Sequence, residues 1–96
     1  MPDPRRQLKL RPDELVWRQV GDEVVLLDTA SSQYISVNRS GAVMWPLLAR
    51  GCEYSALVEA LVAQFDISHD KADLDAGAFV RSLEDLHLLE GSEHPS

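Results

Sequence analysis

Cysteine is almost absent from this chain, and long apolar runs are missing altogether. The 96 residues include one cysteine, Cys52, so no disulfide can form within the chain, and a reducing compartment suits it. No apolar run approaches the roughly 20 residues that a membrane-spanning helix needs. The first six residues, MPDPRR, lack the apolar core of a signal peptide. These absences predict a cytoplasmic protein with no membrane partner.

Basic residues are in the minority. Nine Lys and Arg residues stand against sixteen Asp and Glu, which gives a formal net charge of -7 at pH 7. Affinity for nucleic acids depends on cations that neutralise the phosphate backbone, so a nucleic-acid partner is not expected. A surface of this sign favours a neutral or basic partner, chiefly by raising the rate of association.

Motifs for catalysis and for metal binding are also missing. The histidines, His69, His87 and His94, lie far apart and share no zinc-ligand spacing with Cys52. The acidic segment DISHDKADLD, residues 66–75, fails as a calcium loop because lysine and glycine stand at the sixth and twelfth positions, where an EF-hand requires glycine and glutamate. Neither a glycine-rich phosphate loop nor a nucleophile elbow is present. We expect no enzymatic activity, no metal ion and no cofactor.

Three short segments have the character of β-strands. The segment Leu15–Val20, with Trp17 as its large apolar residue, is followed by the turn signal Gly21-Asp22, which closes a hairpin onto Glu23–Asp28. The second segment is apolar at four consecutive positions, which predicts a central strand covered on both faces. A polar turn then leads into Gln33–Val37. The three segments predict an antiparallel meander in which the third strand lies at an edge.

A helix is predicted directly after the third strand. Asn38 and Ser40 are both good N-cap residues for it, and Gly51 ends it. Pro46 removes a backbone donor beyond the first turn and is expected to kink or split this helix. The apolar residues at helical spacing, which should form its buried face, are Gly41, Met44, Trp45 and Leu48.

Two further helices complete the chain. The first of them begins near residues 53–55, and the other runs from Ser68 or His69 to about Leu86. The predicted buried stripe of the former is Tyr54, Leu57, Val58, Leu61 and Phe65, and that of the latter is Ala72, Ala76, Phe79, Val80, Leu83 and Leu86. Strands followed by helices predict an α+β fold. We expect a flexible arm over residues 1–9, a folded domain over residues 10–90 and a flexible tail over residues 91–96.

The third predicted strand lacks the usual protection of a sheet edge. Charge, proline or a bulge commonly blocks such an edge, yet QYISV has no charge and no proline. Tyr34 and Ser36 should point to one face and Ile35 and Val37 to the other. Two arrangements fit this sequence: another segment of the chain covers the edge, or the edge receives a strand from another polypeptide.

The sequence from Leu8 to Leu89 resembles the PqqD-like proteins, also called recognition elements for ribosomally synthesised and post-translationally modified peptides, or RiPP recognition elements. The family pattern has an asparagine after the third strand, then a glycine, an apolar-Trp pair, a second glycine, and an acidic and apolar pattern on the third helix. In this chain those positions are Asn38, Gly41, Met44, Trp45, Gly51, Asp75, Phe79, Leu83, Leu88 and Leu89.

The resemblance implies a winged helix-turn-helix-like fold of three antiparallel strands followed by three helices. It also implies a non-catalytic protein that binds the leader of a precursor peptide as a strand added to the third strand, in a groove beside the third helix. The peptide-binding residues that it implies are Gln33, Tyr34, Ile35, Ser36, Val37, Asp75, Ala78, Phe79 and Ser82. The small side chains at positions 78 and 82 suit the close approach of a peptide.

As a freestanding short chain, the protein is most similar to the leader-recognition proteins of split lasso-peptide pathways. Its implied partners are the precursor leader, a separate leader peptidase and the cyclase. Members that serve as peptide chaperones for a radical enzyme in quinone-cofactor biosynthesis have the same size and layout, so that role stays an alternative. Two positions depart from the family pattern: Pro46 interrupts the first helix, and His87 stands where members often carry a helix-ending glycine.

Two rival functions remain open. The fold also permits a winged-helix protein that binds nucleic acids, although the third helix carries mainly acidic residues and is poorly suited to a DNA groove. The other rival is a structural subunit whose edge strand pairs with the same strand of a second copy.

Overall fold

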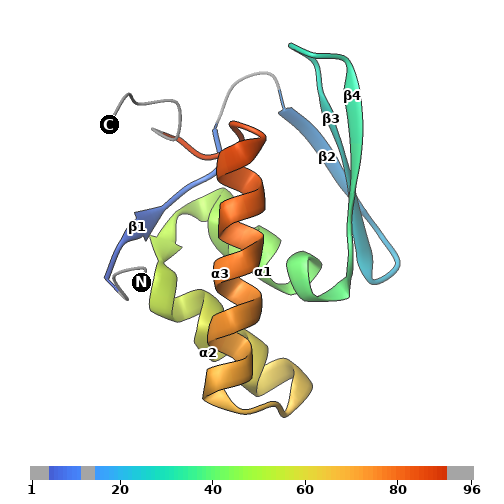
Figure 1. The fold of residues 1–96 in the computed structure, drawn as a ribbon. Coiled ribbons are helices and arrows are strands. Elements are labelled where there is room, and N and C mark those ends of the chain that lie inside the picture. Colours follow the sequence, from blue (N-terminus) through green and yellow to red (C-terminus); the bar gives the residue numbers. More distant parts are fainter. Residues whose placement is uncertain (1–4, 12–14, 91–96) are drawn as a thin grey trace.

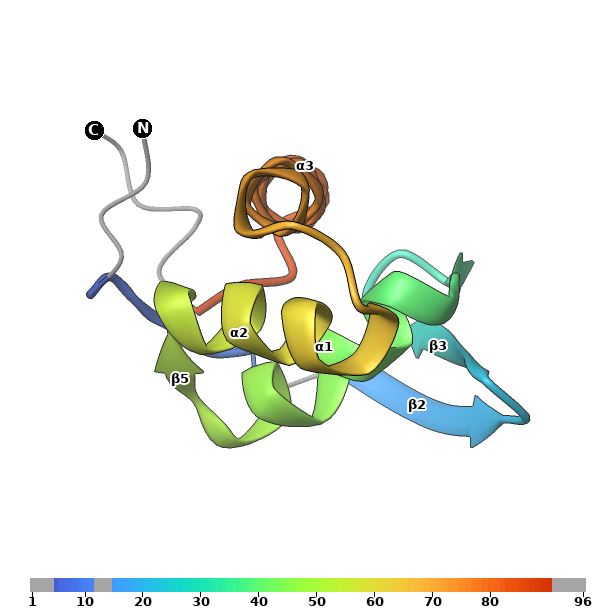
Figure 2. The same cartoon turned by 90° about the horizontal axis from the view of Figure 1, so that it is seen from below.

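The computed structural model describes residues 5–11 and 15–90. Its elements, in chain order, are β1 (Gln7–Leu8), β2 (Leu15–Val20), β3 (Glu23–Asp28), β4 (Gln33–Val37), α1 (Arg39–Arg50), β5 (Cys52–Glu53), α2 (Tyr54–Phe65) and α3 (His69–Asp85). A three-stranded antiparallel sheet precedes three helices, which confirms the predicted α+β fold with its winged helix-turn-helix-like order (Figure 1). Viewed from below, the helices lie to one side of the sheet (Figure 2).

The three predicted strands occur with the predicted bounds, and their order in the sheet is β2-β3-β4. β3 is therefore central and β4 lies at an edge, as expected. The burial of β3 differs from the prediction, because Val24, Leu26 and Asp28 are buried while Val25 and Leu27 are only half-buried. The helices cover one face of the sheet and leave the face of Val25 and Leu27 open. The expectation that both faces of β3 are covered was therefore wrong.

α1 begins at an asparagine cap and runs unbroken through its proline. The Asn38 side chain accepts a hydrogen bond from the Gly41 backbone N–H at 3.1 Å. The expected split at Pro46 does not occur, since residues 39–50 form one helix. Burial of the helix compensates for the missing donor: Trp45 is fully buried, and its ring meets that of Trp17 edge to face, with centroids 6.0 Å apart. The other fully buried side chains of α1 are those of Met44 and Leu48.

The buried faces of α2 and α3 follow the predicted stripes at eight of the eleven positions. The predicted residues that are buried are Tyr54, Leu57, Val58, Leu61, Ala72, Ala76, Val80 and Leu83, while Phe65 and Phe79 are half-buried. Leu86, which was predicted to be buried, is 40% exposed. α3 ends at Asp85, so Leu86 lies beyond the last helical turn and leaves the helical periodicity.

The segment before the first hairpin is part of the fold. β1 pairs with β5 in a small antiparallel sheet, and Leu8 is buried. Leu10 and Leu89 form a further antiparallel bridge. Within the expected flexible arm, residues 7 and 8 are thus ordered, and strands of two residues have no periodicity from which to predict them. Residues 1–4 and 91–96 lie outside the described residues.

A buried carboxylate ties this N-terminal segment to the sheet. Asp28 is buried, accepts the Ala30 backbone N–H at 3.0 Å, and lies 3.1 Å from the Arg11 guanidinium. Burial acts to raise the pKa of Asp28, but the hydrogen bonds from the turn and the nearby guanidinium outweigh it and hold the pKa below its ordinary value. The carboxylate therefore stays charged and fixes the start of the β3–β4 turn against residue 11.

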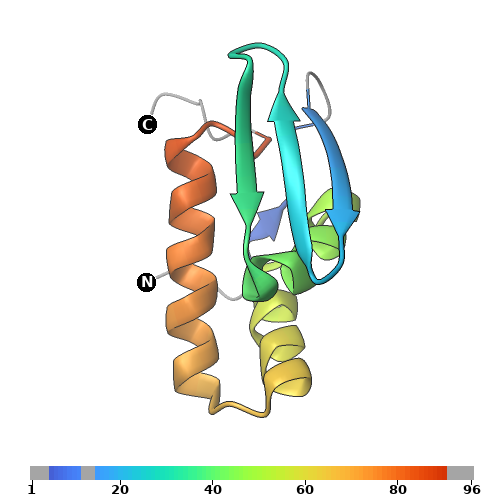
Figure 3. The same cartoon turned by 90° about the vertical axis from the view of Figure 1, so that its right-hand side faces the viewer.

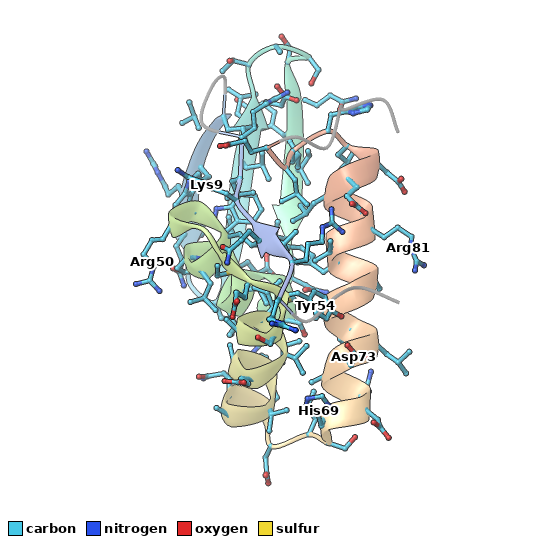
Figure 4. The ribbon with its side chains drawn as sticks, turned by 90° about the vertical axis from the view of Figure 1, so that its left-hand side faces the viewer. Lys9, Arg50, Tyr54, His69, Asp73 and Arg81 are labelled. Atoms are coloured by element: carbon cyan, nitrogen blue, oxygen red, sulfur yellow. The ribbon has the colours of Figure 1, made fainter. Side chains whose placement is uncertain are left out.

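A hydrogen bond between α2 and α3 sets their packing (Figure 4). The Tyr54 side chain points from α2 toward Asp73 on α3, and its hydroxyl lies 2.9 Å from both the backbone carbonyl and a carboxylate oxygen of Asp73. Burial, followed by the hydrogen bond and the charge of Asp73, raises the pKa of Tyr54 to about 12. The protonated phenol is thus the form that the fold stabilises.

We expect Tyr54→Phe to lower the free energy of unfolding by about 1 kcal/mol, because the Asp73 oxygens lose their donor. Since the folded pKa lies above the unfolded value of about 10, this stabilisation is complete below pH 10 and declines as the pH rises toward 12. Urea unfolding at pH 7 and between pH 10 and 12 measures both effects. A variant whose stability falls as steeply in alkali as that of the wild type would contradict the role of the phenol.

His87 occupies a left-handed backbone conformation directly after α3, with φ of 58°. Members of the family that the sequence resembles often carry a helix-ending glycine at this position, and glycine adopts such angles without the steric cost that a Cβ brings. We therefore expect His87→Gly to raise the free energy of unfolding by about 0.5–1 kcal/mol in chemical denaturation at pH 7. A loss of stability would show that the imidazole contributes more than the backbone strain costs.

Candidate functional site

The free edge of β4 is the first feature of the site. β4 pairs with β3 along one side, and no other strand of residues 5–11 and 15–90 pairs with it. α3 lies alongside this edge and runs in the opposite direction to β4 (Figures 1 and 3). The first of the two arrangements considered from sequence was that another segment of the chain covers the edge; no strand of the described part does so. The outer edge of β4, with which no described strand pairs, therefore faces the side of α3.

The side chains of β4 divide between the two faces of the sheet as predicted. Ile35 lies opposite Leu26 and Val37 opposite Val24, so both belong to the face that the helices cover. Gln33 belongs to the same face. The side chains that belong to the open face are those of Tyr34 and Ser36, and Tyr34 is 77% exposed. Of the five predicted strand residues, Ile35 is the apolar side chain that remains half-buried beside the free edge.

A pocket of about 420 Å³ lies between α3 and the first turns of α1; we call it the α1–α3 pocket. Its lining residues are Asn38, Ser40, Gly41, Met44, Lys71, Asp75, Ala78, Phe79 and Ser82. All four predicted residues of the third helix line it. The predicted β4 side chains do not, because the pocket begins where β4 ends. The edge of β4 and the α1–α3 pocket are thus two adjoining features, and a peptide groove between the third strand and the third helix stays a prediction.

Gly41 joins these two parts. A Cβ at this position would overlap Cγ1 of Val37, the last residue of β4, and would lie 2.8 Å from Cε1 of Phe79 on α3. Glycine therefore lets the end of the strand, α1 and the Phe79 ring approach one another. Phe79 is half-buried, so one part of its ring packs on the core and another part lines the pocket.

The charged groups in the pocket form a pair. Lys71 Nζ donates a hydrogen bond to Asp75 Oδ1 at 2.9 Å, four residues apart on α3. Ala78 and Ser82, one and two turns further on, are exposed and small. Sequence reasoning named Asp75 but missed Lys71, although the spacing of four between opposite charges is a known signal of helical ion pairs. It also missed Ser40, which lines the pocket. The polar side chain of this residue does not by itself indicate that it lines a pocket.

Two further observations concern the one cysteine and the possible metal ligands among the described residues. Burial raises the pKa of the Cys52 thiol, and the charge of Arg50 opposes this only in part, so the thiol is not activated. Residues 5–11 and 15–90 contain no group of three or more His, Cys, Asp or Glu side chains that could hold a metal ion. Among these residues there is also no helix that is both long and apolar enough to span a membrane.

This fold and site define a PqqD-like protein, the class also called RiPP recognition elements. The family model described as "Coenzyme PQQ synthesis protein D (PqqD)" matches residues 23–89, and the chain belongs to this family. No curated protein matches the chain by sequence.

Two solved structures are similar to it. One is "TbiB1 in Complex with the TbiA(beta) Leader Peptide", with a TM-score of 0.78 and 31% identity over 86% of this chain and 95% of that one. The other is "Lasso peptide synthetase B1 complexed with the leader peptide", with a TM-score of 0.74 and 26% identity over 86% of this chain and 96% of that one. The similarity thus extends over almost the whole length of both B1 proteins.

Proposed function

We propose that this protein binds the leader of a ribosomally made precursor peptide by strand addition to β4, and presents the precursor to the enzymes that modify it. The observation that carries the proposal is the free β4 edge, which adjoins the α1–α3 pocket. Backbone hydrogen bonds to the edge would supply affinity, and the pocket would supply specificity for leader side chains. Two similar solved structures are complexes with leader peptides, which supports this reading.

We also propose an orientation for the leader from the relative directions of β4 and α3. A strand antiparallel to β4 runs in the same direction as α3, because α3 itself runs opposite to β4 (Figure 3). The N-terminal part of the leader would then occupy the α1–α3 pocket, beside the Lys71–Asp75 pair. Its C-terminal part would pass Ile35 and leave the protein near the β3–β4 turn. The peptide-binding residues of this proposal are Gln33, Tyr34, Ile35, Ser36, Val37, Asp75, Ala78, Phe79 and Ser82, joined by Gly41.

In this role the protein is a non-catalytic member of a lasso-peptide pathway. Its enzyme partners would be a separate leader peptidase and the cyclase, and it would act in the cytoplasm. The lasso pathway is favoured over quinone-cofactor biosynthesis because one similar structure is a lasso peptide synthetase B1 in its own description. Binding of nucleic acids is disfavoured by the net charge of -7.

Calorimetric titration with the cognate leader tests this function. The control ligands are a peptide of the same composition in scrambled order and a random DNA duplex at low salt. We expect saturable binding of the leader alone. Equal affinity for the scrambled peptide would refute sequence-specific leader recognition, and tight, salt-sensitive binding of the duplex would establish the nucleic-acid alternative.

A further inference from the structure

The open face of the three-stranded sheet is unusually apolar for a surface exposed to water. We call it the outer face and define it by the side chains that alternate away from the helices: Val16, Arg18, Val20, Glu23, Val25, Leu27, Tyr34 and Ser36. Val16 is 62% exposed and Val20 is 55% exposed. In Figure 3 this face is turned toward the viewer, and no described helix crosses it.

The apolar side chains of the outer face form one continuous surface. Val16 lies opposite Leu27, and Leu27 lies opposite Tyr34, so one apolar row crosses all three strands. These residues, with Val20 and Val25, line a hollow of about 420 Å³. A strand with a water-exposed face normally alternates apolar and polar residues, and a contiguous apolar row on that face marks an interaction site. Core packing does not explain the row, because the helices lie on the opposite face.

One unpaired cation lies within this apolar surface. Arg18 is opposite Val25 in the register and makes no ion pair with any residue of 5–11 and 15–90, including Glu23 on the same face. An arginine that lies among apolar side chains suits a partner carboxylate, because the surrounding apolar contact would exclude water from the pair. A second copy of this chain is a poor occupant, since each copy carries a net charge of -7 and the two would repel.

The outer face also continues into the proposed leader site. Tyr34 belongs to β4, the strand whose free edge would receive the leader. In an added strand every second side chain points to the outer face, so this surface would extend directly onto the bound leader. A protein seated on the outer face would therefore touch the bound precursor at the point where the leader leaves the α1–α3 pocket.

We propose that the outer face is the docking surface for an enzyme that processes the bound precursor, and that this enzyme presents an apolar patch with a carboxylate opposite Arg18. The inference rests on the proposed function for the identity of the partner, and on the exposed row and the lone cation for the location. Docking here leaves the α1–α3 pocket free, so the leader and the enzyme bind at the same time.

The test uses the peptidase that cleaves the same precursor, with this protein immobilised and peptidase affinity measured by biolayer interferometry. Val20→Glu and Arg18→Glu change exposed side chains of the outer face. Leu74→Glu is the control, because Leu74 is 72% exposed on α3 and belongs neither to the outer face nor to the lining of the α1–α3 pocket. We expect at least a tenfold loss of peptidase affinity for both outer-face variants and less than a twofold change for Leu74→Glu. Leader affinity, titrated separately, should stay within twofold in all three.

Several outcomes would overturn the proposal. Peptidase that does not bind the wild type, or that binds Val20→Glu and Arg18→Glu as tightly as the wild type, excludes the outer face as its docking surface. Sedimentation velocity tests whether a second copy of this chain occupies the outer face. A wild-type dimer that Val20→Glu converts to a monomer would assign the face to that second copy. Absence of leader binding by the wild type would refute the proposed function instead, and the separate titration detects that failure independently.

Discussion

Gly41→Ala is expected to destabilise the protein by about 1–3 kcal/mol and to weaken leader binding as well. The new Cβ would overlap Val37 Cγ1 and lie 2.8 Å from Phe79 Cε1. Val37 is buried, so relief of its overlap must displace the end of β4 or the start of α1, and the half-buried Phe79 ring must shift as well. Both changes alter the α1–α3 pocket and the adjoining end of β4. Overpacking of this kind costs more than the gain in helix propensity from glycine to alanine returns. Urea unfolding and leader titration measure the two effects.

Gly77→Ala is the matched control for this substitution. Gly77 also lies in a helix, but a Cβ there would meet only the Tyr54 hydroxyl, at 3.3 Å. We expect its stability to stay equal to the wild type or to rise by about 0.5 kcal/mol, since alanine favours helix more than glycine does. Equal stability of the two variants would show that the contact of Gly41 with β4 and α3 does not matter.

Ala78→Glu is expected to weaken leader binding by about tenfold to a hundredfold while leaving the fold intact. Ala78 is exposed and lines the α1–α3 pocket. The new carboxylate would therefore occupy space that the peptide needs, and it must lose its water when the peptide binds. A loss of about 1.4–2.8 kcal/mol corresponds to that range, and burial of an unpaired charge readily costs as much. Titration calorimetry with the leader measures the effect directly.

The control for Ala78→Glu is the same chemical change on another helix. Ala63 is exposed on α2 and does not line the pocket, so Ala63→Glu should bind the leader with wild-type affinity. Urea unfolding of both variants establishes that neither has lost its fold. If Ala78→Glu bound as tightly as Ala63→Glu, the α1–α3 pocket would have no part in leader recognition.

The strands could be predicted from the sequence because their signals are local. The Gly21-Asp22 turn closes the first hairpin, and the alternation in QYISV gives the bounds of β4. The order of the three strands in a meander then places β4 at an edge. The asparagine cap of α1 and the serine cap of α3 are similarly local. What sequence reasoning missed depends on contacts between distant residues. β1 has two residues, and its partner β5 lies more than forty positions away.

The lining of the α1–α3 pocket was predictable in part, but the arrangement of its residues was not. Of the five α3 side chains that line the pocket, all except Lys71 were named in advance from the family resemblance. Their partner proved to be the start of α1, because the path of the chain through Asn38 brings Ser40 and Gly41 under Phe79. The predicted split of α1 at Pro46 was wrong. The rule for an isolated helix predicts a break at proline, whereas the burial of Trp45 and Leu48 holds this helix together.

The arrangement separates three tasks in a chain of 96 residues. The buried faces of the helices and one face of the sheet form the core. The free edge of β4 and the α1–α3 pocket form the proposed leader site, and the outer face forms the proposed docking surface for an enzyme. Because the last two share β4, the precursor and the enzyme that acts on it would meet along a single strand.

Amide hydrogen exchange of β4 with and without the leader tests the central claim most directly. Alternate residues of an edge strand direct their backbone N–H groups outward, so alternate amides within residues 33–37 should become protected when a strand is added. We predict at least a tenfold slowing at those alternate positions, together with nuclear Overhauser contacts between the leader and the β4 backbone. A leader that binds while every β4 amide keeps its exchange rate would contradict strand addition and place the peptide elsewhere on the protein.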